Sequence, residues 1–212
     1  VVDLNTILSL PGAHNWQNAA AAYATTKAIG VQPHAIMSCL QSYPGLVHRQ
    51  EAVEIVDGVA FVNDSKATNT NATAKALVCY ENIYWIVGGR PKEGGLEGLS
   101  DHLSDVRHAF LIGESALEFS AFFDGNISMT MAGDLVTAVD KAYQMAKQEG
   151  LSKPVVLLSP ACASFDQFAN FEARGDAFKE MVEALTGIHQ DPFEVPDLFP
   201  IKRVPKSIGV GS

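Results

Sequence analysis

Few cysteines and few basic residues mark this sequence, and each shortage disfavours a class of protein. Its three cysteines, Cys39, Cys79 and Cys162, are odd in number and show neither C-x-x-C spacing nor a Cys/His cluster. They predict reduced, buried thiols rather than a disulfide framework or a zinc site. The 15 Lys and Arg against 24 Asp and Glu give a net charge of −9. This balance argues against binding to nucleic acid or to an anionic membrane, because surfaces that bind phosphates concentrate basic residues.

Long apolar runs and two ligand motifs are also missing. No run approaches the roughly 20 apolar residues of a membrane span, and Val1 opens no signal peptide. We therefore expect a cytoplasmic protein. The sequence contains no G-x-x-x-x-G-K-[ST] phosphate loop and no acidic or histidine cluster suited to magnesium. With 212 residues, 47% of them hydrophobic, it is long enough for one large domain or for one domain and part of another.

The chain from residue 51 onward alternates strand and helix signals. The apolar runs 51–56 and 59–63 flank Asp57-Gly58, the strongest local signal for a β-hairpin. Further runs typical of strands alternate with capped or amphipathic runs typical of helices. The expected strands are 83–88, 109–113, 127–131 and 154–158, and the expected helices are 71–80, one opened by a capping box at 115–118, 134–149 and 170–185. This order predicts an α/β fold, a Rossmann-like and mostly parallel sheet with an opening β-hairpin.

The two ends of the chain differ from this pattern. Residues 14–29 and 32–43 predict two helices, the first rich in alanine, and Pro44-Gly45 ends the second. Two helices do not make a domain, so we expect residues 1–44 to be the end of an upstream domain. Residues 188–212 combine several prolines with little periodicity and predict an extended or disordered tail.

Polar runs follow three of the predicted strands. Residues 63–69 set an acid, a cation and two hydroxyls just beyond the hairpin. Residues 159–168 set hydroxyls and a carboxamide beyond the last strand, and residues 88–92 place a lysine after a Gly-Gly pair. Ligand sites in open α/β sheets lie at such strand ends. The three runs therefore predict a binding site.

These runs, together with two earlier ones, resemble the signature of the bacterial Mur ligases that add D-glutamate to UDP-N-acetylmuramoyl-L-alanine. The five matching segments, in family order, are 12–18, 45–49, 63–69, 88–92 and 159–175. Members of this family have a domain for the uridine nucleotide, a central ATPase domain and a C-terminal Rossmann-like domain. The resemblance implies that residues 1–44 end the central ATPase domain and that residues 45–187 are the Mur ligase C-terminal domain.

The family resemblance also implies an activity in peptidoglycan precursor synthesis. ATP phosphorylates the carboxylate of the muramoyl-alanine substrate, and the amine of D-glutamate attacks the acyl phosphate. The implied cofactors are ATP and magnesium, with the metal ligands expected upstream of Val1. The implied partners are D-glutamate and, through other domains, UDP-N-acetylmuramoyl-L-alanine. We expect a monomer that is inactive by itself, because the phosphate loop is missing from this sequence.

The resemblance assigns D-glutamate to five residues, Lys66, Thr68, Lys92, Ser164 and Phe171. Among these, Lys66 and Lys92 are the implied catalytic cations, since the reaction needs developing negative charge to be neutralised. Ser164 and Phe171 are seven residues apart and would lie on one side if their segment were helical.

The resemblance assigns ATP to Asn15, Asn18, Arg49 and Asp64. The two asparagines are three apart on one face of the alanine-rich helix, where carboxamides could bind an adenine or ribose edge. The guanidinium of Arg49 suits a phosphate.

Each assignment has a structural alternative. Lys92 alone would be a solvated lysine in a Gly-rich loop. Asn15, Ser164 and either Thr68 or Asn69 could cap helices.

The remaining candidates also have alternatives in which they play a structural role. The ring of Phe171 would be a core residue, and Arg49 and Asp64 would form an ordinary ion pair. His48 is more often structural than a general base in this setting, and Cys162 more often a buried hydrophobe than a nucleophile.

Two other interpretations of the function of the whole chain stay open. One is a sister enzyme, either another amino-acid-adding Mur ligase or a folylpolyglutamate synthase. The other is a non-catalytic, Rossmann-like binding module, because a fold alone fixes no chemistry.

Overall fold

A six-stranded sheet forms the body of the protein, in the order β1-β2-β6-β3-β4-β5. The computed structural model describes residue 7, residues 9–186 and residues 199–202. The strands are β1 (Glu51–Val56), β2 (Val59–Asn63), β3 (Ile83–Gly88), β4 (Val106–Ile112), β5 (Ser128–Gly133) and β6 (Val155–Leu158). Only β1 and β2 pair antiparallel, and all other neighbours pair parallel. The predicted fold, a mostly parallel sheet opened by a hairpin, is confirmed.

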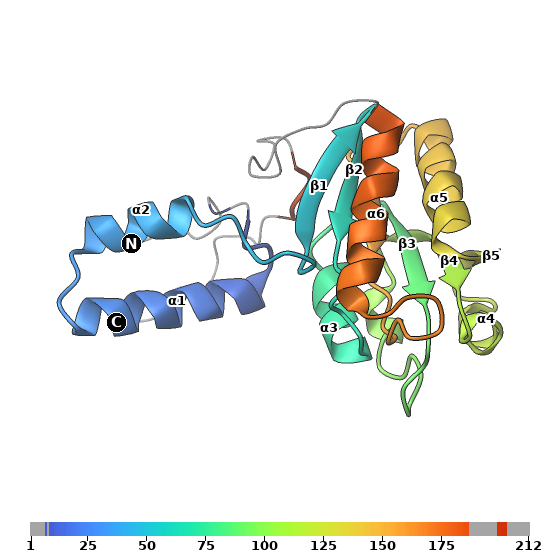
Figure 1. Cartoon of the computed structure of the whole chain (residues 1–212), viewed down its shortest axis with the longest axis horizontal. Helices are drawn as coiled ribbons and strands as arrows, with labels where there is room; N and C mark the ends of the chain where they lie inside the picture. Colours follow the sequence, from blue (N-terminus) through green and yellow to red (C-terminus); the bar gives the residue numbers. More distant parts are fainter. Residues whose placement is uncertain (1–6, 8, 187–198, 203–212) are drawn as a thin grey trace.

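Helices cover both faces of this sheet (Figure 1). They are α3 (Thr70–Leu77), the short 3₁₀ helix η2 (Ser100–His102), α4 (Ala116–Phe123), α5 (Leu135–Glu149) and α6 (Phe171–Thr186). Alternate residues of each strand point to opposite faces. In β3, Tyr84 and Ile86 pack in the cluster with α5 and α6, whereas Trp85 packs in the cluster with α3 and α4. The near-continuous apolar strands thus support two cores, as expected for a sheet buried on both faces.

Two helix ends agree with the signals predicted from the sequence, and a third does not. Asp134 caps α5 by accepting a hydrogen bond from the Thr137 amide, and Gly150 ends the helix in the left-handed conformation. The capping box predicted at Ser115 is wrong, although α4 begins there. The Ser115 hydroxyl makes no cap and instead accepts a hydrogen bond from the amide of Gly89, 3.2 Å away.

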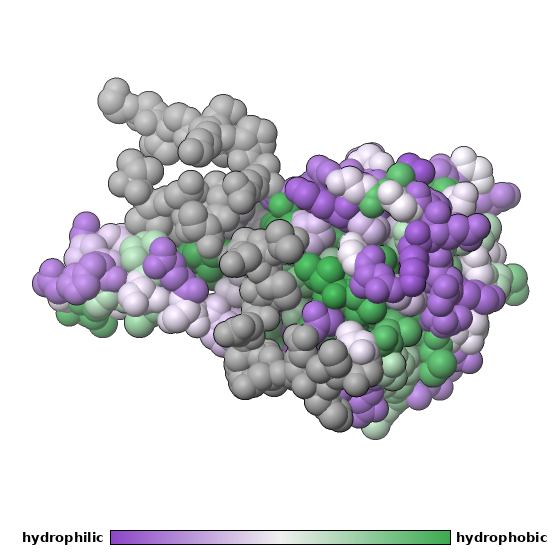
Figure 2. All heavy atoms as spheres, turned by 90° about the horizontal axis from the view of Figure 1, so that it is seen from above, coloured by the Kyte–Doolittle hydropathy of each residue, from purple (hydrophilic) through white to green (hydrophobic). Residues whose placement is uncertain are grey.

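The two predicted N-terminal helices are confirmed as α1 (Ala13–Ala28) and α2 (Pro33–Gln41), which form an arm beside the sheet body (Figure 1). Only Ala19 and Ile36 are buried within them. Figure 2 accordingly shows many hydrophilic residues over the visible face of the arm. The domain boundary placed at residue 44 stays a prediction.

The cysteines are free, as predicted, but they are not all buried. Cys79 and Cys162 are buried, whereas Cys39 is exposed on α2. The prediction of three buried thiols is therefore wrong for Cys39.

Part of the C-terminal tail packs on the body. Residues 199–202 form neither helix nor strand, and the rest of the predicted tail lies outside the described residues. The side chain of Phe199 is 6% exposed and joins the core cluster beneath α3 and α4. Lys202 donates its backbone amide to the carbonyl of Cys79 at 2.7 Å and forms an ion pair with Asp105. These four residues are therefore part of the folded body, which the tail prediction did not anticipate.

We expect Phe199→Ala to lower the free energy of unfolding by roughly 3 kcal/mol, because it removes a buried ring from the core. Urea denaturation monitored by circular dichroism measures this change. The matched control is Phe165→Ala, since Phe165 is 61% exposed. Its effect should stay within about 0.5 kcal/mol. Equal stabilities for the two variants would show that the tail contact does not contribute to the fold.

Candidate functional site

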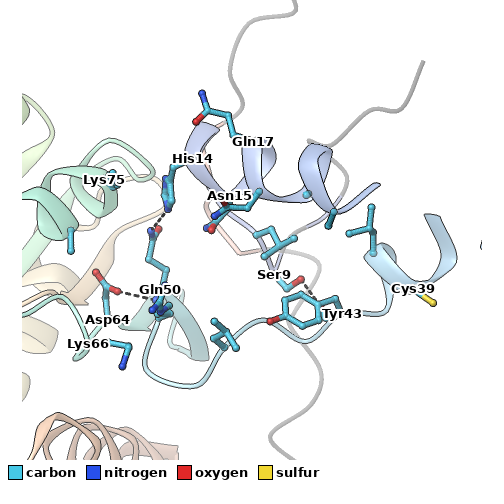
Figure 3. Close-up of a pocket in the computed structure, with 18 of the residues that line it drawn as sticks. Ser9, His14, Asn15, Gln17, Cys39, Tyr43, Gln50, Asp64, Lys66 and Lys75 are labelled. Atoms are coloured by element: carbon cyan, nitrogen blue, oxygen red, sulfur yellow. Dashed lines mark hydrogen bonds between the residues drawn. The ribbon is translucent and has the colours of Figure 1, made fainter. Parts of the chain in front are cut away.

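A cavity of about 1010 Å³ lies between the helical arm and the sheet body (Figure 3). Its wall combines residues of α1 and α2 with the loops before β1 and after β2. All four residues assigned to ATP from the sequence line it, namely Asn15, Asn18, Arg49 and Asp64. A cavity of this size is large enough for a nucleotide. The structure therefore brings the predicted nucleotide residues together.

Asn15 belongs to the first turn of α1 and is not its cap. The N-cap is Gly12, so the alternative of Asn15 as an N-cap is wrong. The Asn15 side-chain nitrogen donates to the carbonyl of Pro11 at 2.8 Å. That bond holds the side chain at the cavity wall, and Asn18 lines the same cavity one turn later.

Asp64 is a buried acid in the cavity wall with a shifted pKa. Its carboxylate is 6% exposed and accepts hydrogen bonds from the Gln50 amide at 3.1 Å and from the Ser159 hydroxyl at 2.8 Å. Burial raises its pKa to about 7, although the two hydrogen bonds and the charge of Arg49 favour the ionised form. No ion pair joins Arg49 and Asp64 among the described residues, so the ion-pair alternative is wrong.

Lys66 lies where the cavity meets the second group of predicted residues. It lines the cavity, and its ammonium group lies 3.9 Å from the ring centroid of Phe171. The Phe171 ring also packs edge-on against His48, with 6.0 Å between centroids. Because the Phe171 side chain is only partly buried and belongs to neither core cluster, its interpretation as a core residue is wrong. This cation–π contact holds Lys66 between the residues predicted for ATP and those predicted for D-glutamate.

Lys92 and Thr68 come from different strand ends and meet. The Lys92 ammonium donates to the Thr68 hydroxyl at 3.5 Å. Asn69, not Thr68, caps α3 by accepting from the amide of Ala72 at 2.9 Å. The Thr68 hydroxyl is therefore not used as a cap, and both side chains stand at the carboxyl edge of the sheet.

Ser164 is buried in a turn that precedes α6. Its side chain is 2% exposed, and its hydroxyl makes no hydrogen bond within the described part of the chain. Its carbonyl accepts from the amides of Gln167 and Phe168, so this segment is a turn and α6 begins only at Phe171. The helical spacing argument for Ser164 and Phe171 is therefore wrong, and so is the alternative that the Ser164 side chain caps a helix.

The loops after β3 and β6 are joined by close backbone contact. The amide of Arg90 donates to the carbonyl of Ala163 at 2.9 Å, and the reverse bond is 3.1 Å. Gly89 has a φ of +134°, and a Cβ atom at this position would lie 2.4 Å from the carbonyl oxygen of Ala163. Glycine is required here because any side chain would force the two loops apart.

Two residues without an assigned binding role organise the site. Arg174 is 1% exposed and donates to oxygens of Ser65 and Cys162. Its role was not predicted from the sequence, although Arg174, Phe178 and Val182 recur every four residues and therefore share the buried face of α6.

His48 is the second organising residue and behaves as its structural alternative predicts. It is 4% exposed, and its Nδ1 atom lies 3.0 Å from the side-chain nitrogen of Asn63. Burial is the main cause that lowers its pKa, which favours the neutral ring. A Cβ atom at Gly175 would lie 2.2 Å from His48 Nδ1, so the ring packs directly against the backbone of α6.

The described residues contain no group of three or more His, Cys, Asp or Glu side chains able to hold a metal ion. Nor does any helix among them have the length and apolar character needed to cross a membrane. Burial raises the pKa of the Cys162 thiol to about 11, which agrees with a buried hydrophobe and not with a nucleophile.

The fold is that of the Mur ligases. It is similar to UDP-N-acetylmuramate-alanine ligase MurC from Thermotoga maritima, with a TM-score of 0.55, 16% identity, and coverage of 82% of this chain and 39% of that one. A pseudomurein peptide ligase type C from Methanothermus fervidus gives a TM-score of 0.53 at 16% identity, with coverage of 82% and 36%. At these identities the likeness concerns the fold alone. No protein-family model matches the sequence.

Curated sequences narrow the family. UDP-N-acetylmuramoylalanine–D-glutamate ligase from Paramagnetospirillum magneticum is 53% identical over 184 residues, which are 87% of this chain and 40% of the relative. Its namesake from Rhodospirillum rubrum is 52% identical over 87% of this chain and 39% of the relative. The chain thus spans about 40% of the length of these relatives. Over the part that it shares with them, the chain is similar to UDP-N-acetylmuramoylalanine–D-glutamate ligases, and the resemblance predicted from the sequence is confirmed.

Proposed function

We propose that this chain supplies the amino-acid site, and one wall of the ATP site, of a ligase that joins D-glutamate to UDP-N-acetylmuramoyl-L-alanine. The observation that carries the proposal is the contact between Lys92 and Thr68 at 3.5 Å. Two residues that follow different strands, and that were both assigned to D-glutamate, meet at the carboxyl edge of the sheet. Such an edge is where ligands of open α/β sheets bind.

Lysines at this edge suit a substrate with two carboxylates. The chain carries a net charge of −9, so an anionic amino acid must be held by local cations and donors rather than by a general positive field. Lys66 and Lys92 are both exposed and supply those charges, with the Thr68 hydroxyl as a neutral donor beside them. Ser164 and Phe171 complete the proposed D-glutamate set and follow β6, which lies between β2 and β3 in the sheet.

The cavity beside the arm supports the assignment of ATP. Carboxamides of Asn15 and Asn18, the guanidinium of Arg49 and the carboxyl group of Asp64 offer donors and acceptors for a base, a ribose and phosphates. The described residues offer no cluster suited to magnesium, so we assign no metal ligand in this part of the chain. The metal that the family implies would be held by residues elsewhere.

The arrangement accounts for an acyl-phosphate route. A carboxylate oxygen of the muramoyl-alanine substrate takes the γ-phosphoryl group of ATP, and ADP leaves. The amine nitrogen of D-glutamate then forms the C–N bond, the C–O bond to phosphate breaks, and the amine loses a proton. Lys66 lines the ATP cavity and touches Phe171 of the amino-acid group, so its charge lies between the two reactants. There it would stabilise the negative charge that develops during transfer.

This function places the protein in peptidoglycan precursor synthesis in the cytoplasm, as a monomeric enzyme. Both relatives reported above at about 50% identity carry the name of the D-glutamate ligase. No specific feature of the site favours a sister ligase, a folylpolyglutamate synthase or a non-catalytic module.

Titration with D-glutamate tests the amino-acid assignment directly. In ¹⁵N-labelled chain we expect D-glutamate to shift the backbone resonances of Lys66, Thr68, Lys92, Ser164 and Phe171, because they surround the ligand. L-glutamate at the same concentration and ionic strength should shift them at least about fivefold less, since the wrong enantiomer cannot pair both carboxylates at once. D-aspartate controls for charge. Equal responses to both enantiomers, or shifts confined to other residues, would contradict the proposal.

A further inference from the structure

Arg174 is a buried cation whose Nε and Nη2 atoms have backbone and hydroxyl partners, whereas its Nη1 atom has no hydrogen-bond partner in the described part of the chain. Its Nε donates to the hydroxyl of Ser65 at 3.0 Å, and its Nη2 donates to the carbonyls of Ser65 at 2.8 Å and Cys162 at 3.1 Å. It forms no ion pair with a carboxylate in the described part of the chain. A buried charge that two loops hold by hydrogen bonds, with no acid beside it, ties those loops to one geometry.

Both of these loops carry residues of the proposed amino-acid site. Ser65 directly precedes Lys66 in the loop after β2. Cys162 lies two residues before Ser164 in the loop after β6. Arg174 thus links the two loops through hydrogen bonds from a single guanidinium.

Arg174 also lies close to a glycine of the third loop, which follows β3. The Nη1 atom of Arg174 lies 3.3 Å from the point where a Cβ atom on Gly89 would stand. Gly89 begins the loop that carries Lys92, and the next residue pairs with Ala163 through two backbone hydrogen bonds. The guanidinium therefore lies directly beneath the place where the loops after β3 and β6 meet.

Ser65 connects Arg174 to the start of its own helix. The Ser65 hydroxyl accepts from Arg174 Nε and donates to the carbonyl of Phe171 at 2.8 Å. Burial lowers the pKa of Arg174 to about 10, so it remains protonated at neutral pH and keeps these donors. The position of Phe171, and of the Lys66 ammonium on its ring, follows from the same network.

We propose that Arg174 is a positioning residue for the amino-acid substrate, whose planar guanidinium fixes the three strand-end loops at the spacing that D-glutamate requires. The inference rests on the proposed function. Arg174 does not touch the substrate in this arrangement but acts through Lys66, Ser164 and Lys92. Lysine has the same charge but lacks the planar guanidinium with its several N–H donors, so it cannot join Ser65 and Cys162 in the same way.

The test is steady-state kinetics of Arg174→Lys and Arg174→Met in the ligase that contains this chain. We expect kcat/KM for D-glutamate to fall between about 10- and 100-fold in both variants, because small displacements of positioning groups have effects of this size. The KM for ATP should stay within about twofold, since the hydrogen bonds that Arg174 makes in the described part of the chain go to Ser65 and Cys162 and not to the four residues assigned to ATP. Recovery of normal D-glutamate kinetics by Arg174→Lys would overturn the proposal, because charge alone would then suffice.

Two controls separate positioning from loss of stability. Val182→Ala removes buried volume from the same helix without touching the loops, and it should leave both KM values unchanged. Ser65→Ala keeps Arg174 but removes the shared hydroxyl, and it should raise the KM for D-glutamate about five- to tenfold. Ser65→Ala also serves if the Arg174 variants do not fold. An unchanged KM for D-glutamate in Ser65→Ala, or an equal change in Val182→Ala, would contradict the proposal.

A failure of positioning can be told apart from a failure of the proposed function. If Lys92→Ala weakens D-glutamate while Arg174→Lys and Ser65→Ala do not, the amino-acid site stands and only the positioning role is lost. If Lys92→Ala also has no effect on D-glutamate, the proposed function itself is wrong.

Discussion

Replacement of Lys92 by alanine in the ligase that contains this chain should raise the KM for D-glutamate about ten- to hundredfold, since a charge-assisted hydrogen bond contributes ~1.5–3 kcal/mol. The KM for ATP should stay nearly unchanged. Lys92 contacts Thr68 and is absent from the cavity wall that holds the proposed ATP residues. Its loss therefore removes a proposed carboxylate partner without altering the proposed nucleotide site. Initial rates with each substrate varied at saturation of the others measure both constants.

Arg49→Ala is the matched variant with the opposite expectation. Arg49 lines the cavity beside the arm, and its proposed contact is to phosphate. The KM for ATP should therefore rise more than the KM for D-glutamate. Equal losses for both substrates in both variants would mean that Lys92 and Arg49 support the closure of the site as a whole, and the separate assignments would then be withdrawn.

The fold was readable from sequence wherever a local signal and the tertiary environment agree. The run at 83–88 is apolar at nearly every position, and β3 is buried on both faces with the predicted bounds. Asp57-Gly58 marked the hairpin, because both residues adopt positive φ and close the turn between β1 and β2. At Ser115 the local pattern predicted a capping box, but the hydroxyl instead accepts a tertiary hydrogen bond from the amide of Gly89 in another loop. A short motif cannot reveal a partner that lies 26 residues away in the chain.

The sequence predicted which residues belong to the candidate site, but not how deeply they are buried or which residues they contact. The runs after β2 and β3 placed Thr68 and Lys92 at strand ends, and the structure brings them together. Nothing in the sequence reveals that Asp64 is buried, or that its carboxylate accepts a hydrogen bond from Ser159, which follows another strand. Arg174 was missed for the same reason, since an arginine in an amphipathic helix is usually solvated and its partners lie on distant loops. The contact between residue 199 and the core spans too many residues for any local pattern to signal it.

Burial of Asp64 should make the stability of the protein depend on pH in a direction opposite to that of a salt-bridged acid. The folded state raises the pKa of this carboxyl group from 3.8 to about 7, mainly by desolvation. Below pH 3.8 both states are protonated. As the pH rises through the window from 3.8 to about 7, the unfolded chain releases its proton while the folded protein keeps it, so stability falls. Above that window the contribution is constant.

We expect Asp64→Asn to remove this dependence, because the amide has nearly the same shape and does not ionise. Between pH 4 and pH 8, the free energy of unfolding of Asp64→Asn should rise relative to the unsubstituted chain by up to about 4 kcal/mol, at 1.36 kcal/mol for each unit of pKa shift. Urea denaturation at several pH values measures the difference, and the comparison cancels the other titrating groups. Asp140→Asn, at an exposed position of α5, controls for the loss of one negative charge. If the curves for Asp64→Asn and the unsubstituted chain run parallel across this range, the pKa of Asp64 is the same in the folded and the unfolded state. Its carboxyl group would then be ionised at neutral pH and meet the proposed nucleotide as a full charge.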